Sequence, residues 1–243
     1  MNLDVVLLPR DLQSGALAGR VVVVFDVLRA TTTMTAALAA GVHEIRIFAD
    51  IAAAAAAARS FSDSRILCGE ERCLRPPGFD LGNSPGAFTR ELHESKTVLM
   101  STSNGTRAIL AAKGARTVFI GALVNAQAVA RALTQERLDV LLLCAGTNGE
   151  MALEDLIGAG AVIEELSQLA SVQLKSDRAL VAKRVFESGR RDLPGVLRQS
   201  KGGRNIIEAG LEPDIDFAAR LNSINAVGVV DGELPHIRMR KNA

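Results

Sequence analysis

The sequence has very few aromatic residues and no excess of charge of either sign. It contains no Trp and no Tyr, so stacking on nucleobases or sugar rings is not the expected mode of binding. The 28 Lys and Arg residues nearly balance the 27 Asp and Glu residues, and the formal net charge is +1. Because a nucleic-acid backbone is held by a field of basic residues, we expect no nucleic-acid partner.

Cysteine and histidine are also scarce. The three cysteines, Cys68, Cys73 and Cys144, are odd in number and irregularly spaced, which argues against a disulfide framework and against a four-thiolate zinc site. None of the three histidines is spaced to share a metal ion with another. This usage is typical of a reducing compartment, and we expect a cytoplasmic protein.

Long apolar runs are missing as well. No run approaches the roughly 20 residues that span a bilayer, and the N-terminus lacks the basic and apolar segments of a signal peptide. We therefore expect a soluble protein without a membrane partner. The 243 residues suffice for a single α/β domain over 1–243, helix-rich from about 150. Its Ala-rich helices are compatible with a homodimer.

One local plan occurs three times, starting at Val21, Thr97 and Val140. Each segment has a short aliphatic run, then small and hydroxyl-bearing residues, then a helical pattern. Such runs are typical of strands buried on both faces, and each segment predicts a βα unit. We expect an α/β fold: a largely parallel or mixed central sheet with helices on both faces, in three α/β/α layers.

Further elements fit between these units. Strands are predicted over 43–48, 65–68, 117–120 and 226–230, and helices over 51–59, 125–133, 175–186, 193–199 and 202–209. Asp50, Asn125 and Ser200 are the expected helix starts, and Gly210 is an expected stop. The segment 69–88 is rich in Pro and Gly and predicts an ordered functional loop. The polar tail from His236 is expected to fray.

Polar residues are concentrated where the predicted strands end. Asp26 and Arg29 follow the first strand, Glu70 follows the strand at 65–68, and STSNGT (101–106) and GTNG (146–149) follow two others. Ligands of open parallel sheets bind at the carboxyl ends of the strands. Backbone amides and hydroxyls gathered there suit a phosphate. STSNGT and the threonines after Arg29 could equally be helix caps, and GTNG could be an ordinary turn.

The carboxylates admit two interpretations. Asp26 ends an apolar strand, where it could bind Mg²⁺ or pair with Arg29; Glu70 and Asp80 could complete the metal shell. Glu154 and Asp155 open a helix and could merely complement its dipole. No Walker-type phosphate loop, haloacid-dehalogenase aspartate pair or cysteine-phosphatase motif is present. A metal-activated water is therefore the expected nucleophile.

Four motifs together resemble the 2-phosphosulfolactate phosphatase family: FDVLRATTT, GFDLGNSP with the preceding GE, STSNGT and CAGTNGEMALED. They occur in the family's order, and SKGGRNI with the following GLEPDIDFAARLN extends the likeness over nearly the whole chain. The resemblance implies the α/β fold of that family and a Mg²⁺-dependent phosphoric monoester hydrolase of coenzyme M biosynthesis. Its implied substrate is 2-phospho-3-sulfolactate and its product sulfolactate.

The resemblance and the polar residues after the predicted strands together predict the site residues. The catalytic set is Asp26, Arg29, Glu70 and Asp80, and the metal set is Asp26, Glu70 and Asp80. The substrate-binding set is Thr31, Thr32, Thr33, Asn83, Ser84, Ser103, Asn104, Gly105, Thr106 and Arg107. Arg72 and Arg75 also flank the expected crevice. Cys73 stands where the family often has Gly, which leaves the role of Arg72 open; Cys73 itself is expected to be inert.

Two other functions use the same loops. The chain could be a non-catalytic sensor that binds a phosphorylated anionic metabolite, although a pure anion receptor gains nothing from Asp26 and Asp80. It could also be a phosphatase for another small phospho-acid, since nothing in the spacing distinguishes a sulfonate from a carboxylate partner group.

Overall fold

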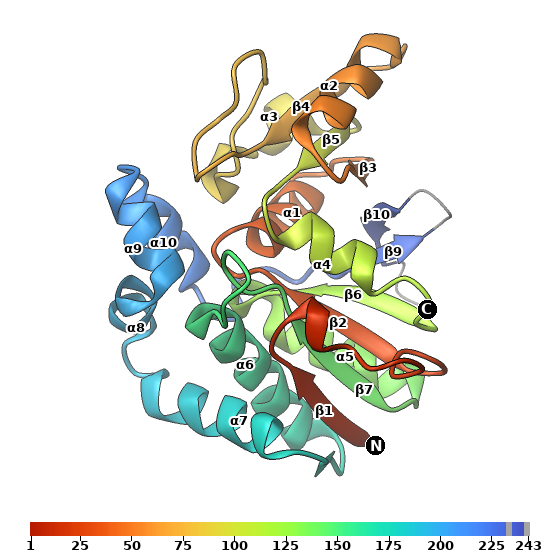
Figure 1. Ribbon diagram of the computed structural model, residues 1–243, viewed down its shortest axis with the longest axis vertical. Coiled ribbons are helices and arrows are strands. Elements are labelled where there is room, and N and C mark those ends of the chain that lie inside the picture. The colour runs from red at the N-terminus through yellow and green to blue at the C-terminus, as the bar shows by residue number, and fades with distance from the viewer. Residues whose placement is uncertain (232–234, 241–243) are drawn as a thin grey trace.

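The computed structural model describes residues 1–231 and 235–240, which form a ten-stranded sheet covered by helices (Figure 1). The strand order is β4-β5-β3-β10-β9-β6-β2-β7-β1-β8. The strands are β1 (Asn2–Val6), β2 (Val21–Phe25), β3 (Glu44–Ile47), β4 (Arg65–Gly69), β5 (Thr97–Ser101), β6 (Thr117–Gly121), β7 (Val140–Cys144), β8 (Gln173–Leu174), β9 (Gly228–Asp231) and β10 (His236–Met239).

Helices connect most of these strands. They are α1 (Ala30–Ala39), α2 (Ile51–Ser60), α3 (Arg90–His93), α4 (Gly105–Ala111), α5 (Ala126–Glu136), α6 (Leu153–Leu169), α7 (Asp177–Gly189), α8 (Leu193–Gln199), α9 (Lys201–Glu208) and α10 (Glu212–Ala218). Short 3₁₀ turns η1 (Pro9–Asp11), η2 (Pro85–Ala87) and η3 (Leu123–Asn125) complete the set. The predicted βα units and the α/β fold class are confirmed.

The sheet consists of two parallel sets of strands that run in opposite directions. Strands β6, β2, β7, β1 and β8 are mutually parallel, and so are β3, β5 and β4. The strands β9 and β10 lie between the sets, and each of their pairings is antiparallel. Three successive reversals give the two sets opposite directions, so their carboxyl ends are not on one edge as a simple parallel sheet would require.

Alternating side chains of β2 feed two separate cores. Val21, Val23 and Phe25 pack with residues of α5, α6 and α7, whereas Val22 and Val24 pack with residues of α1 and α4. All five side chains are fully buried. Strands buried on both faces have no polar face, which explains the unbroken apolar run in the sequence. Helices therefore cover both faces of this part of the sheet.

The three helix starts are as predicted. Asp50 accepts a hydrogen bond from Ala53 N at 2.7 Å, and Ser200 accepts one from Gly203 N at 3.0 Å. Asn125 is the N-cap residue of α5. Its side chain accepts a hydrogen bond from Ala122 N at 2.8 Å, before the helix, and not from an amide of α5.

The polar tail is the clearest correction. Residues 236–239 do not fray: they form β10 in the middle of the sheet, and residues 241–243 lie outside the described part of the chain. Glu44 of β3 explains why this strand can be polar. Its buried carboxylate binds Arg46 at 2.6 Å and Arg238 at 2.6 Å, so a pair of cations compensates one buried charge.

The segment between β4 and α3 is irregular, as predicted, yet well anchored. Phe79 packs against Leu67 and Leu99 in a small core of its own. The backbone of Leu81 forms a parallel bridge with Cys68, next to the end of β4. The long loop is thus fixed against the sheet at the point where β4 ends.

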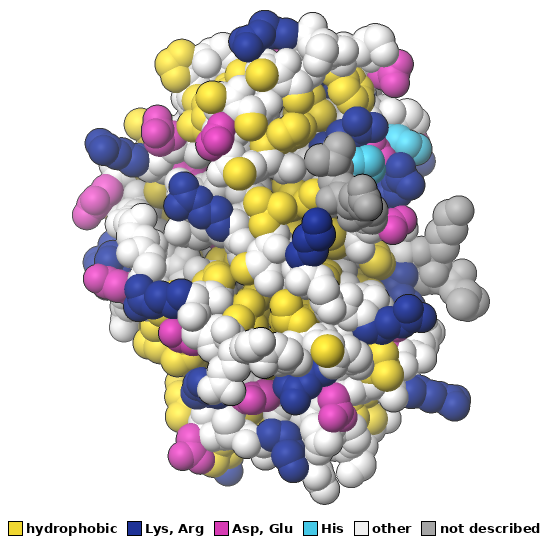
Figure 2. All heavy atoms as spheres, turned by 45° about the vertical axis from the view of Figure 1, so that its right-hand side comes forward, with side chains coloured by type: hydrophobic (Ala, Val, Ile, Leu, Met, Phe, Trp, Pro, Cys, Tyr) yellow, Lys and Arg dark blue, Asp and Glu magenta, His cyan; other side chains and the backbone are white. Residues whose placement is uncertain are grey.

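The surface view shows Lys and Arg side chains interspersed with Asp and Glu, without a field of one sign on that face (Figure 2). Among the described residues, no helix is both long enough and apolar enough to cross a membrane.

Candidate active site

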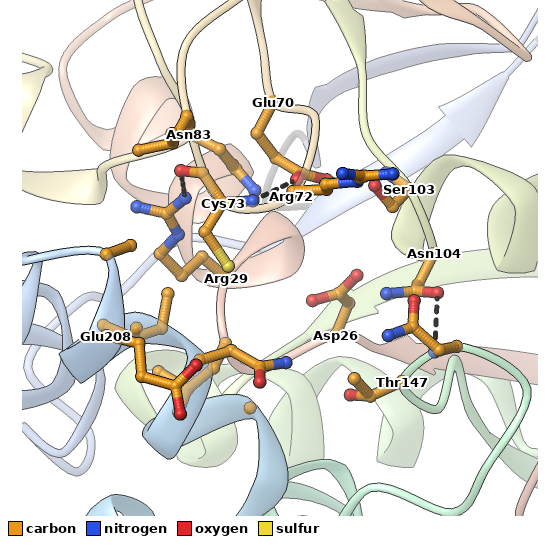
Figure 3. Close-up of a pocket in the computed structure, with 17 residues that line it drawn as sticks. Asp26, Arg29, Glu70, Arg72, Cys73, Asn83, Ser103, Asn104, Thr147 and Glu208 are labelled. Carbon is orange, nitrogen blue, oxygen red and sulfur yellow. Dashed lines mark hydrogen bonds between the residues drawn. The ribbon is translucent and has the colours of Figure 1, made fainter.

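A cavity of about 510 Å³ lies where both parallel sets of strands end. The loops after β2, β4, β5 and β7 and one side of α9 line it, contributing for example Asp26, Glu70, Ser103, Thr147 and Glu208 (Figure 3). The expected convergence of four strand-end loops is therefore observed. Although the two sets run in opposite directions, the residues that follow β2 and β7 in one set and β4 and β5 in the other line the same cavity.

Asp26 follows β2 directly and lines the cavity. Its Oδ1 accepts a hydrogen bond from Ala30 N at 3.1 Å, while Oδ2 has no hydrogen-bond partner among the described residues. Burial raises the pKa of Asp26 from 3.8 to about 7, and the charges of Glu70 and Glu154 add to the effect. The alternative pairing of Asp26 with Arg29 is not formed.

Glu70, directly after β4, is the second carboxylate in the cavity lining. Its Oε1 accepts from Ser103 N at 2.7 Å and its Oε2 from Cys73 N at 2.9 Å. Glu70 thereby ties the loop after β4 to the loop after β5 through two backbone donors.

Arg29 also lines the cavity, but its charge is already paired. The buried guanidinium binds Asp214 of α10 at 2.6 Å and donates to Cys73 O at 2.6 Å and to Ser84 Oγ at 3.2 Å. Ser84 in turn donates to Asp214 at 2.8 Å and does not line the cavity. Arg29 and Ser84 therefore join the loops after β2 and β4 to α10.

The three threonines of the first motif are fully buried in α1 and do not line the cavity. Thr31 donates its hydroxyl to Asp26 O at 2.9 Å, Thr32 to Val27 O at 2.7 Å and Thr33 to Asn83 O at 3.0 Å. These hydroxyls satisfy backbone carbonyls around the turn that presents Asp26, and the structure does not bring them to the cavity.

The STSNGT turn after β5 is divided between two tasks. Ser103 and Asn104 line the cavity, and Asn104 Oδ1 accepts from Asn148 N at 3.3 Å. Thr106 is buried and exchanges hydrogen bonds with Thr102. Gly105 lies so close to Asp26 that a Cβ would be 2.8 Å from its Oδ2. Arg107, which directly follows the STSNGT motif, is exposed and does not line the cavity.

Asp80 is not brought together with Asp26 and Glu70. Its Oδ2 accepts from Leu67 N at 2.7 Å and binds Arg65 at 3.2 Å, on an exposed part of the long loop. Asn83, from the same loop, does line the cavity. Within residues 1–231 and 235–240, no group of three or more His, Cys, Asp or Glu side chains is placed to hold a metal ion. A metal site here would rest on Asp26 and Glu70.

Two more carboxylates lie behind the cavity, in the first turn of α6. Asp155 accepts from Val27 N at 2.8 Å and from Gly146 N at 2.9 Å, which joins the loops after β2 and β7. Glu154 is nearly inaccessible, and its Oε2 has no hydrogen-bond partner in the described part of the chain. Burial raises the pKa of both side chains, and for Asp155 the nearby Asp26 and Glu154 add to it. They are more than complements of a helix dipole.

Helix α9 was not expected at the site. This helix provides Asn205 and Glu208 to the cavity lining. Its Gly202 approaches Glu154 so closely that a Cβ would lie 1.9 Å from Oε1. The paired glycines in SKGGRNI were the available signal, because Gly at a helix start often permits a close approach.

The fold and cavity define a class of protein: an α/β protein with carboxylate, hydroxyl and amide side chains gathered around one cavity where strands of its sheet end. Residues 6–233 match the family described as 2-phosphosulpholactate phosphatase. Proteins named probable 2-phosphosulfolactate phosphatase are similar to the chain: that of Carboxydothermus hydrogenoformans is 39% identical, covering 93% of this chain and 92% of its own. That of Symbiobacterium thermophilum is 39% identical (88% and 92%), and that of Clostridium perfringens strain SM101 is 35% identical (93% and 92%).

The chain therefore belongs to the 2-phosphosulpholactate phosphatase family. The resemblance inferred from the four motifs is confirmed. Each of the four motifs contributes at least one residue to the cavity lining. In chain order, these include Asp26, Asn83, Ser103 and Thr147.

Proposed function

We propose that this protein is a Mg²⁺-dependent phosphatase that hydrolyses 2-phospho-3-sulfolactate to 3-sulfolactate and inorganic phosphate, a reaction of coenzyme M biosynthesis. The observation that carries the proposal is the shared cavity of Asp26 and Glu70 with the turns at Ser103 and Thr147. Family membership supports the reaction class, and the relatives' names supply the substrate. In the reaction, water adds to phosphorus as the ester P–O bond breaks, and a proton passes to the leaving oxygen.

The cavity suits a hard divalent cation. Mg²⁺ favours one or two carboxylates together with water and substrate oxygens, and Asp26 and Glu70 would hold it. Asn83 also lines the cavity, and its Oδ1 is buried without a hydrogen-bond partner in the part of the chain described. Such an orphaned acceptor is costly unless a cation or donor binds it. When bound, the ion would polarise a phosphate oxygen and lower the pKa of a water.

The chain's own groups account for binding and orientation. Ser103 and Asn104 line the cavity, and the hydroxyl of Ser103 and the side-chain amide of Asn104 can donate to phosphate oxygens as charge develops on them. Among the described residues, Asp26 Oδ2 accepts no hydrogen bond, whereas Oδ1 accepts from Ala30 N. Glu70 keeps the loops after β4 and β5 at a fixed separation through its two backbone donors.

Electrostatics favours a metal-dependent enzyme over a simple anion receptor. Asp26, Glu70 and Glu208 all line the cavity, and Arg29 is neutralised by Asp214. Without a cation, these carboxylates would repel a substrate that carries phosphate, sulfonate and carboxylate groups. A receptor that binds a phosphorylated acid without turnover remains the alternative outcome of the test below.

The test measures phosphate release from 2-phospho-3-sulfolactate with Mg²⁺ or with EDTA. Asp26→Asn should lose at least about 10³-fold in kcat/KM, since it removes several kcal/mol of transition-state stabilisation. Asp80→Asn is the matched control, because Asp80 lies outside the cavity, and it should stay within about twofold. Metal-independent turnover or an unimpaired Asp26→Asn would reject the proposal. Faster hydrolysis of phosphoglycerate would show a phosphatase for another small phospho-acid.

A further inference from the structure

The loop after β4 contains a tight turn whose geometry does not suit its residues. Glu71 and Leu74 exchange backbone hydrogen bonds of 3.0 and 3.1 Å, which closes a two-residue hairpin. The two central residues, Arg72 and Cys73, have φ angles of +51° and +69°. Asn-Gly and similar pairs are favoured in such turns, because a Cβ is strained at positive φ. Residues in such sparsely populated conformations cluster at active sites and ligand clamps.

The turn is fixed by hydrogen bonds from both sides. Cys73 N donates to Glu70 Oε2 at 2.9 Å, and the buried Arg29 donates to Cys73 O at 2.6 Å. Both central side chains line the cavity, and Figure 3 shows them between Arg29 and Ser103. Arg72 therefore has a backbone position that is held in place, although its side chain is exposed at the mouth of the cavity.

The charge of Arg72 is also uncompensated. Arg29, the other cation of the cavity lining among the described residues, is ion-paired with Asp214. Arg72 makes no ion pair and no side-chain hydrogen bond within residues 1–231 and 235–240. A guanidinium offers forked donors that match the oxygens of a sulfonate or carboxylate. An unpaired guanidinium at the mouth of this cavity is consequently available to an anionic group of a ligand.

We propose that Arg72 determines specificity by binding an acidic group of the substrate other than the phosphate, either the sulfonate or the carboxylate. The proposal rests on the proposed function. The reacting phosphate belongs on the buried side, beside Asp26, which is 7% exposed. The remainder of a three-carbon substrate then extends toward the mouth, where Arg72 lies.

The first experiment compares three substrates with wild type and Arg72→Gln. These are 2-phospho-3-sulfolactate, 2-phospholactate, which lacks the sulfonate, and 2-phosphooxyethanesulfonate, which lacks the carboxylate. Arg72→Gln should lower kcat/KM by about 10- to 100-fold, mainly through KM, for the substrates that carry the recognised group. For the substrate that lacks this group, the change should stay within about twofold.

Arg75→Gln is the matched control, because Arg75 is exposed on the same loop, donates to Asp80 O and does not line the cavity. It should leave all three substrates within about twofold of wild type. An equal loss on all three substrates with Arg72→Gln would assign Arg72 to the phosphate and overturn the proposal. No loss on any of them would overturn it as well.

A second measurement does not depend on turnover. Cys73 is the accessible thiol, since Cys68 and Cys144 are fully buried. Its labelling rate is measured with a methanethiosulfonate reagent that carries a sulfonate and with one that carries a trimethylammonium group. If Arg72 attracts sulfonates, Arg72→Gln should lower the ratio of the two rates by about tenfold, and Arg75→Gln should not.

The two measurements separate the possible failures. If wild type hydrolyses none of the three substrates, the proposed function fails, and the labelling ratio still decides whether Arg72 serves an anion site. An unchanged ratio in Arg72→Gln would overturn the assignment of Arg72. A changed ratio with an inactive wild type would keep the anion site and reject the phosphatase.

Discussion

Two segments of this protein are rich in hydroxyls and use them differently. ATTT at the start of α1 and STSNGT, which extends from the end of β5 into α4, both place several hydroxyls at the end of a buried strand. In the first turn, the hydroxyls of Thr31, Thr32 and Thr33 are fully buried and donate to backbone carbonyls. In the second, Ser103 and Asn104 line the cavity. A group of hydroxyls after a strand therefore indicates that hydrogen-bonding groups are needed there. It does not indicate whether they bind backbone carbonyls or line a cavity.

The two turns differ in how completely other parts of the protein bury them. Helix α1 packs against η2, β6 and η3, so its first turn has protein on every side. Buried carbonyls there need donors, and a threonine hydroxyl provides one at short range. The turn before α4 opens instead at the end of β5, beside the cavity. Four substitutions or conditions sharpen this contrast.

The largest effect is expected from the ion pair that supports the buried turn. Asp214→Asn leaves the buried Arg29 without its counter-charge, and the free energy of unfolding should fall by about 3–5 kcal/mol in urea denaturation. Asp216→Asn is the control on the same helix, because Asp216 forms only an exposed pair with Arg198, and it should cost less than about 1 kcal/mol. An equal loss of stability in the two variants would show that the ion pair between Arg29 and Asp214 does not stabilise the buried turn.

A pH series tests the carboxylate that the buried turn presents. The pKa of Asp26 is about 7 in the folded protein, against 3.8 when unperturbed. Between these values the native state keeps a proton that the unfolded state has lost. Without divalent cations, wild type should thus lose about 2–4 kcal/mol of stability, relative to Asp26→Asn, as pH rises from 4 to 8. Parallel stability curves for the two proteins would contradict this expectation.

Gly105 tests the contact where the two turns meet. A Cβ at this position would lie 2.5 Å from Ala30 Cβ and 2.8 Å from Asp26 Oδ2. Gly105→Ala should destabilise the protein by about 1–3 kcal/mol in thermal or urea unfolding and should reduce phosphate release. Gly86→Ala, where a Cβ meets open space, should change stability by less than about 0.5 kcal/mol. A neutral Gly105→Ala would mean that the turns can separate at no cost.

The smallest effects compare one hydroxyl from each turn. Thr32→Val leaves Val27 O without its donor and should cost about 1–3 kcal/mol of stability, with kcat/KM within about twofold of wild type. Ser103→Ala should do the reverse, lowering kcat/KM by about 2- to 10-fold with little change in stability. The comparison fails if Thr32→Val lowers activity while stability stays constant.

The same limit of sequence reasoning applies to the carboxylates. Asp26 and Asp80 both follow a phenylalanine in an apolar context. Phe25 is in the main core, and Asp26 continues from β2 into the cavity. Phe79 packs in the separate small core, and Asp80 folds back to Leu67 N. The two dipeptides look alike in sequence, and the direction in which each aspartate points depends on distant residues.

The sheet order shows the limit on a larger scale. The βα units were predictable, because each depends on a local apolar run followed by a helical pattern. The polar strand β10 was not, since its cations are held by Glu44 of β3, far away in the sequence. Nor was the reversal between the two parallel sets predictable, because it follows from inserting β9 and β10 between β6 and β3.

The sequence by itself determined the βα units, the motifs that assign the family, and the presence of Asp26, Glu70, Asn83, Ser103 and Asn104 at strand ends and in the loop after β4. These features depend on interactions between neighbours in the chain. The tertiary structure alone decided which of the predicted site residues share a cavity. The reason is that some donors and carboxylates are buried or paired with residues distant in the sequence, whereas others remain available. It removed the threonines of α1 and Asp80 from the cavity lining, and it brought in residues of α9.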